Sequence, residues 1–180
     1  MSDAGTVEIK LQLNTIEELF FVSEINPLKP HSRFTSGIDE LLFNLRTIRL
    51  RNNLKIVINL SNSATEPDLE ENVKAALNRY CTAKIEENRA EIRELHRLGW
   101  RALIGAIIVI AVTMGLAALL TTITLFSETT AYLISQGLVV FGWVTLWYPA
   151  NVFLYDWRPY ARAKVGYQRI RNAELVIESA

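Results

Sequence analysis

Between Ala102 and Tyr155, 54 consecutive residues contain a single charged side chain, Glu128, near the middle of the stretch. The apolar segments on either side, Ala102–Phe126 and Ala131–Tyr155, would each extend about 37 Å as an α-helix, against about 30 Å of bilayer hydrocarbon. We therefore expect a transmembrane hairpin whose two helices are joined by a short external turn at residues 127–130.

The charges that flank this hairpin predict its orientation. Basic residues precede the first segment and follow the second, whereas Ser127–Thr130 between them has none. Because basic residues are retained in the cytoplasm, both chain ends are expected there. The first 25 residues contain no signal-peptide pattern, and the lone Cys81 is typical of a reducing compartment.

Three short segments outside the hairpin have the pattern of β-strands. Val7–Leu13 alternates apolar and polar residues, which predicts a half-buried strand. Leu54–Leu60 adds an apolar residue on its other side, as expected for a more central strand, and Glu174–Glu178 is expected to return to the same sheet. The predicted fold class is α+β, a small cytoplasmic domain of strands and helices with a three-stranded sheet and the two-helix hairpin inserted into it. The domain boundaries are 1–101 for the cytoplasmic domain and its long helical stalk, 102–126 and 131–155 for the transmembrane helices, 127–130 for the turn, and 156–180 for a basic tail.

Capping patterns predict where the helices of this domain begin. Thr15 with Glu18 predicts a short helix over Ile16–Val22, and Ser36 with Asp39 predicts another that ends near Leu50. A long helix follows Thr65-Glu66-Pro67-Asp68 and has no Gly or Pro up to Leu98. Its charged half, after Cys81, is either a solvated stalk or a short coiled-coil seam.

The interior of the hairpin contains two primary amides, Gln136 and Asn151, which serve either as structural contacts between helices or in function. Neither segment contains Asp, Glu, Lys, Arg or His, which argues against a transporter that acts alone. Small residues are expected to let the helices pack closely, namely Ala102, Ala106, Ala111, Gly115, Gly137 and Gly142.

Aromatic and basic side chains collect at the cytoplasmic edges of the hairpin, where amphipathic rings are stable between lipid and water. The predicted membrane-interface anchors are Trp100, Arg101, Trp147, Tyr148, Tyr155, Trp157 and Arg158. Pro149 is expected to kink the second helix.

A proline-rich loop before the second predicted helix contains Asn26, His31 and Arg33, which form a candidate binding site.

The end of the second segment carries the chain's most distinctive motif, Gly-Trp-Val-Thr-Leu-Trp-Tyr-Pro from Gly142 followed by Leu-Tyr-Asp-Trp-Arg-Pro from Leu154. Together with the N-terminal strand and the Leu19-Phe20 pair, it resembles a family of uncharacterised bacterial two-span membrane proteins. The resemblance implies the bacterial inner membrane and supplies no activity. An Arg and a Glu of that family are replaced here by Tyr148 and Asn151, so no charged pair is implied at the membrane edge.

Motifs for catalysis are missing from the sequence. There is no phosphate-binding glycine motif, and His31, His96 and Cys81 lie too far apart for zinc-ligand spacing, so no cofactor, metal or catalytic residue is predicted. The zero net charge argues against nucleic acid. We expect a non-catalytic membrane-anchored interaction or sensing module. There are two alternatives. One is an oligomeric membrane-permeabilising effector gated through the cytoplasmic domain, and the other is a membrane-surface enzyme. Candidate partners are membrane lipids, a second copy of the chain, a cytoplasmic protein and a small anionic ligand.

Overall fold

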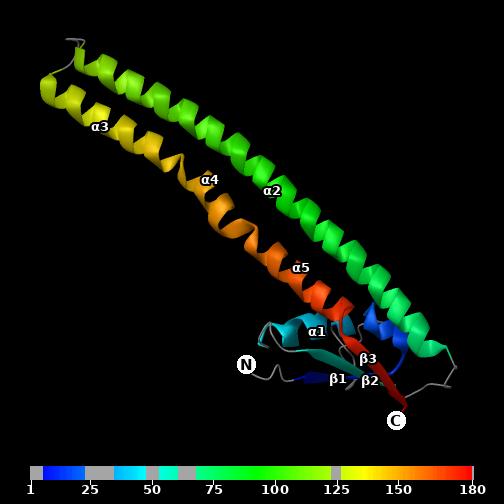
Figure 1. The fold of residues 1–180 in the computed structure, drawn as a ribbon. Helices are drawn as coiled ribbons and strands as arrows, with labels where there is room; N and C mark the ends of the chain where they lie inside the picture. Colours follow the sequence, from blue (N-terminus) through cyan, green and yellow to red (C-terminus); the bar gives the residue numbers. More distant parts are fainter. Residues whose placement is uncertain (1–5, 23–34, 48–52, 61–67, 123–126, 180) are drawn as a thin grey trace, which may run out of the picture. The chain divides into compact units, whose positions relative to one another are not determined.

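The computed structural model describes residues 6–22, 35–47, 53–60, 68–122 and 127–179. The chain forms two compact units, one made of Met1–Asn88 with Arg162–Ala180 and the other of Arg89–Ala161. We call them the sheet unit and the helical unit. In chain order the elements are β1 (Val7–Leu13), the 3-10 helix η1 (Ile16–Leu19), α1 (Gly37–Leu45), β2 (Leu54–Leu60), α2 (Leu69–Thr122), α3 (Glu128–Val144), α4 (Trp147–Asn151), the π-helix η2 (Val152–Asp156), α5 (Arg158–Arg171) and β3 (Glu174–Ser179) (Figure 1).

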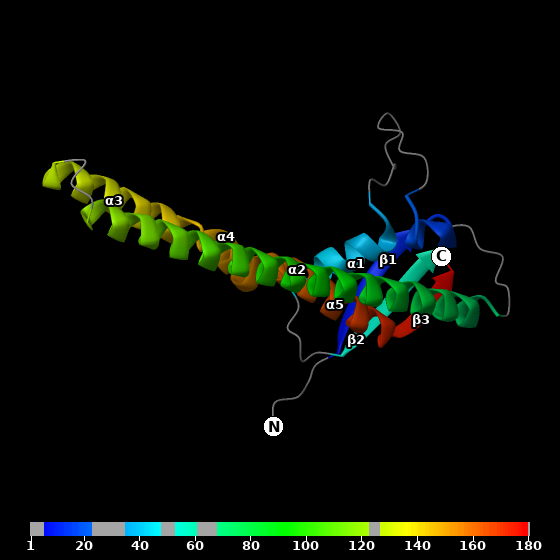
Figure 2. The same cartoon turned by 90° about the horizontal axis from the view of Figure 1, so that it is seen from above.

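The sheet unit contains a three-stranded parallel sheet in the order β1-β2-β3 (Figures 1 and 2). Ile58 of the central strand lies in register with Leu11 on one side and Ile177 on the other. The predicted three-stranded sheet with Leu54–Leu60 at its centre is confirmed. Because parallel neighbours need a crossover, each pair of strands is separated in the chain by helices, which is the connectivity of an α/β unit.

The hydrophobic core lies on one face of this sheet, which α1 and parts of α2 and α5 cover (Figure 1). Leu11 and Ile56 on the strands, and Leu41 and Ile170 on the helices, are almost completely buried in it. The alternation in β1 follows from this arrangement, since Glu8, Lys10 and Gln12 point away from the core and are exposed.

The capping pattern predicts the N-terminus of α1 correctly, but the hydrogen bonds at the start of η1 differ from those of a capping box. The Ser36 hydroxyl accepts a hydrogen bond from the backbone N–H of Asp39 at 3.2 Å, as predicted, and α1 ends at Leu45 rather than near Leu50. The helix predicted over Ile16–Val22 begins at Ile16 as predicted, but it is a 3-10 helix and ends at Leu19. Thr15 makes no side-chain cap, and the Glu18 carboxylate instead accepts from the backbone N–H of Asn14 at 3.0 Å.

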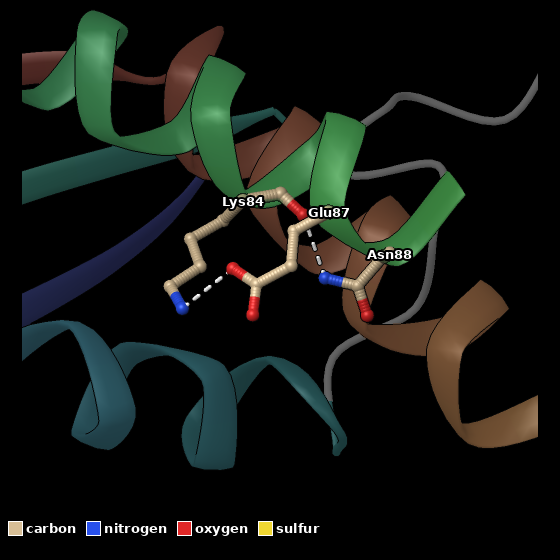
Figure 3. Close-up of polar contacts among 3 residues, drawn as sticks. All are labelled: Lys84, Glu87 and Asn88. Carbon is tan, nitrogen blue, oxygen red and sulfur yellow. Dashed lines mark hydrogen bonds and ion pairs between the residues drawn. The ribbon is translucent and has the colours of Figure 1, made fainter. Parts of the chain in front are cut away.

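The long helix α2 is continuous from Leu69 to Thr122 and passes through Gly99 without a break. Its charged half forms pairs along the helix. Lys84 Nζ lies 2.7 Å from Glu87 Oε2 (Figure 3). Glu94 pairs with Arg97, three residues further along the helix. The Asn88 amide donates to the carbonyl of Lys84 within the same helix (Figure 3). Exposed pairs of this kind contribute little to the free energy of unfolding.

The second apolar segment is not the single helix predicted over Ala131–Tyr155. The predicted turn at 127–130 is also wrong, because the Ser127 side chain accepts from the backbone N–H of Thr130 and α3 begins at Glu128. The helix is interrupted at Thr145–Leu146, where Pro149 has no N–H to donate to the carbonyl four residues earlier. This interruption lies close to the position where Pro149 was expected to kink the helix, and a π-helical turn follows at Val152–Asp156.

Candidate membrane-interface site

Two helical stretches, Leu69–Thr122 and Glu128–Arg171, contain windows long and apolar enough to cross a membrane. Only 17% of the residues in each window are buried, unlike the core helix of a water-soluble domain. The exposed residues include large apolar side chains on both stretches, such as Ile108 on α2 and Leu133 and Phe141 on α3. These helices therefore present an apolar outer surface.

Small side chains form the contact between α2 and α3. The buried residues of α2 include Ala106 and Thr113, seven residues apart, and those of α3 include Ser135 and Gly142, with the same spacing. A Cβ atom added to Gly142 would lie 2.6 Å from Thr113 Oγ1 and 3.4 Å from the Cα of Ile110. The two helices thus approach closely at this point.

Of the small residues expected to allow close packing, Ala106 and Gly142 lie at the contact between α2 and α3, and three others do not. Ala111, Gly115 and Gly137 are exposed, and a Cβ added to either glycine would meet nothing within 4 Å. They lie on the outward sides of their helices. Ala102 is partly buried.

Hydroxyl groups in this region are satisfied within their own helices. Thr113 donates to the carbonyl of Ile110 at 3.0 Å, and Ser135 donates to the carbonyl of Tyr132 at 2.8 Å. The primary amides differ. Gln136 and Asn151 are both exposed, and neither has a hydrogen-bond partner among the residues described for this structure.

An aromatic cluster joins α2 to the π-helical turn and is centred on Phe153. The ring of Trp100 lies edge-on at 5.7 Å between centroids, and that of His96 lies at 6.2 Å. Gly99 makes room for it, since an added Cβ would be 3.0 Å from Phe153 Cζ. Neither Gly99 nor Phe153 was predicted as part of this site. The available signal was Gly99 itself, which is the only glycine between Leu69 and Arg101.

The predicted anchors lie on α2, α4, the π-helix and the start of α5. Trp147 is 72% exposed, and Trp100, Tyr148 and Tyr155 are each more than half exposed. Arg101 and Arg158 are exposed, and the Arg158 guanidinium lies 5.1 Å from the centroid of the Tyr155 ring. Trp157 is half-buried, and its indole N–H donates to the carbonyl of Phe153 at 2.8 Å.

The candidate binding loop with Asn26, His31 and Arg33 lies outside the described residues. The sheet offers another polar surface on the face opposite its helices, where Asn59 lies in register between Gln12 and Glu178. The Asn59 Oδ1 atom is buried and has no hydrogen-bond donor in the described part of the chain. The neighbouring strands carry charges of both signs on this face, including Lys10 on β1 and Glu178 on β3.

Two further properties bear on chemistry. Within the described ranges, no group of three His, Cys, Asp or Glu side chains is placed to hold a metal ion. Cys81 is fully buried in the core of the sheet unit, and burial raises the pKa of its thiol from 9.0 to about 11, which keeps it protonated and unreactive.

Comparison of this chain with protein-family models, with curated proteins and with solved structures found no match. The resemblance to two-span membrane proteins stays a prediction from the residues quoted above.

Proposed function

We propose that this protein is a two-span integral membrane protein whose sheet unit serves as a non-catalytic interaction or sensing module. The observation that carries the proposal is the apolar outer surface of α2 and α3, on which Ile108 is 58% and Leu133 65% exposed. Each such side chain costs free energy in water, at about 25 cal/mol for every Å² of apolar surface, and none in hydrocarbon. A bilayer is the environment that suits this surface.

The pairing of β2 with β3 supports two crossings rather than one. β2 precedes the first apolar segment in the chain and β3 follows the second, yet Ile58 and Ile177 lie in register. Strands that pair must lie on one side of a membrane, so the number of crossings between them is even. The basic residues at the outer ends of both segments favour the cytoplasmic side, and the resemblance favours the bacterial inner membrane.

The surface of the sheet unit suits a protein partner better than a small anion. The outward positions of its strands carry both signs of charge, with Lys10 near Glu8 on β1 and Glu174 and Glu178 on β3. An anion-binding surface would need an excess of basic groups. We therefore propose a cytoplasmic protein as the ligand of this face.

Membrane placement is tested by alkaline carbonate extraction and by cysteine labelling of the full-length chain. Lys10→Cys, Glu174→Cys and Glu128→Cys are each introduced into a Cys81→Ala background and treated with a membrane-impermeant maleimide. We expect the chain to stay in the pellet, position 128 to react in intact spheroplasts, and positions 10 and 174 to react only after permeabilisation. A carbonate-soluble chain, or labelling of 10 and 174 on opposite sides, would overturn the proposal.

The role of the sheet unit is tested on protein purified in detergent. A bound protein partner should be lost when the outward face is changed, as in Asn59→Leu, and kept in a variant of the helical unit such as Trp147→Phe. Dye leakage from liposomes that contain the purified chain would instead favour the permeabilising effector.

A further inference from the structure

Gln136 lies on the side of α3 that faces away from α2. Ala131, Ser135 and Gly142 are the buried residues of α3, and they define the side that contacts α2. Successive residues of an α-helix are separated by about 100°, so Gln136 and Gly137 both fall well outside that contact. Both are exposed in the structure, as are Leu133 and Val140 on the same outward side.

In a bilayer this position leaves the Gln136 amide without a partner. It lies nine residues after Ser127, about 13 Å along the helix, which is well inside about 30 Å of hydrocarbon. A primary amide offers two donors and an acceptor oxygen, and lipid tails satisfy none of them. No described residue of the chain bonds to it either, so its partner has to come from outside the described part of the chain.

The surroundings of Gln136 allow a second helix to come close. Gly137 has no side chain, and a Cβ placed there would meet nothing within 4 Å. Leu133 and Val140, which are 65% and 60% exposed, lie one turn before and one turn after this amide and glycine pair. A shallow apolar seam with one polar group at its centre is the kind of surface on which membrane helices associate.

We propose that a second copy of this chain packs on this face and that the two Gln136 amides form hydrogen bonds with each other. The inference rests on the proposed membrane placement. A second copy fits because an amide is both donor and acceptor, so two identical amides satisfy each other across a two-fold axis. Two copies inserted in the same orientation place their Gln136 residues at the same depth in the bilayer. The two amides can therefore meet across a two-fold axis that runs along the membrane normal.

The test is Förster transfer between donor-labelled and acceptor-labelled full-length protein in liposomes, diluted stepwise with lipid. Gln136→Leu keeps the size of the side chain and removes the amide, so the dimer should weaken by about tenfold. Gly137→Leu fills the seam and should also reduce transfer. The matched controls are Asn151→Leu, which removes an exposed amide nearer the predicted membrane edge, and Gly105→Leu, which fills an equally open position on α2. Both controls should leave transfer unchanged.

Carbonate extraction of each variant separates the two proposals. A chain that stays in the pellet but shows no transfer at any dilution, or one whose transfer is unaffected by Gln136→Leu, overturns the second-copy proposal and leaves membrane placement intact. Equal loss from Asn151→Leu and Gln136→Leu also overturns it, because the effect would then not be specific to this face. A chain absent from the pellet overturns both.

Discussion

Gly142 of α3 lies directly against Thr113 of α2, with its missing Cβ position 2.6 Å from the threonine hydroxyl oxygen. An added Cβ would also lie 3.4 Å from the Cα of Ile110, so it would contact the backbone of α2 as well as the threonine hydroxyl. This contact sets how closely the two helices of the helical unit approach each other.

Gly142→Ala should therefore destabilise the helical unit by about 1–3 kcal/mol, the usual cost of overpacking. Thermal denaturation of the protein in detergent measures it. Thr113→Ala in the same chain removes the nearest atom and should recover part of the loss. Gly115→Ala is the matched control, since a Cβ there meets nothing and improves helix propensity. Equal losses from Gly142→Ala and Gly115→Ala would show that this contact is not the cause.

Ile58→Ala should destabilise the sheet unit by about 2–5 kcal/mol, because Ile58 is fully buried in the central strand. Lys10→Ala on the exposed side of β1 should change stability by less than about 0.5 kcal/mol. Urea unfolding can be followed by the reaction of Cys81 with a thiol reagent, since that side chain is buried in the same core. A midpoint for Ile58→Ala that equals that of the parent chain would contradict the packing described.

The sheet unit should lose stability between about pH 9 and pH 11. Burial raises the pKa of Cys81 to about 11, so above pH 9 the unfolded state loses this proton first and is favoured as the pH rises. A shift from 9.0 to about 11 corresponds to a loss of roughly 2–3 kcal/mol for that thiol. Burial also raises the pKa of Tyr167 to about 12, so this phenol adds to the loss of stability at higher pH. Urea midpoints, followed by circular dichroism, should fall less steeply in Cys81→Ala, and an identical slope would rule the thiol out.

Trp157→Phe should cost about 0.5–1.5 kcal/mol, because it keeps an aromatic ring at this position, although a smaller one, and removes the indole N–H that donates to the Phe153 carbonyl. The comparison is Trp147→Phe, in which the lost indole is 72% exposed. Thermal transitions of the two variants in the same detergent give the difference. If Trp147→Phe is the more costly change, the π-helical turn does not depend on this hydrogen bond.

Much of the local structure could be predicted from the sequence. The alternation in Val7–Leu13 and Leu54–Leu60 matches the strand boundaries, and Ser36 caps its helix as expected. Thr15 and Glu18 have the same type of spacing but form no reciprocal cap, since Asn14 takes the carboxylate. A capping pattern therefore fails to predict the hydrogen bond where a neighbouring residue provides another donor.

The sequence by itself determined the strands, the two apolar stretches and the helix interruption caused by Pro149, because each depends on residues close together in the chain. Only the tertiary structure decided that the three strands are parallel, that Gly99 accommodates Phe153, and that Gly142 packs while Gly137 faces outward. The two glycines are chemically identical. What distinguishes them is the side of α3 that meets α2, and that depends on a partner segment some thirty residues away in the chain.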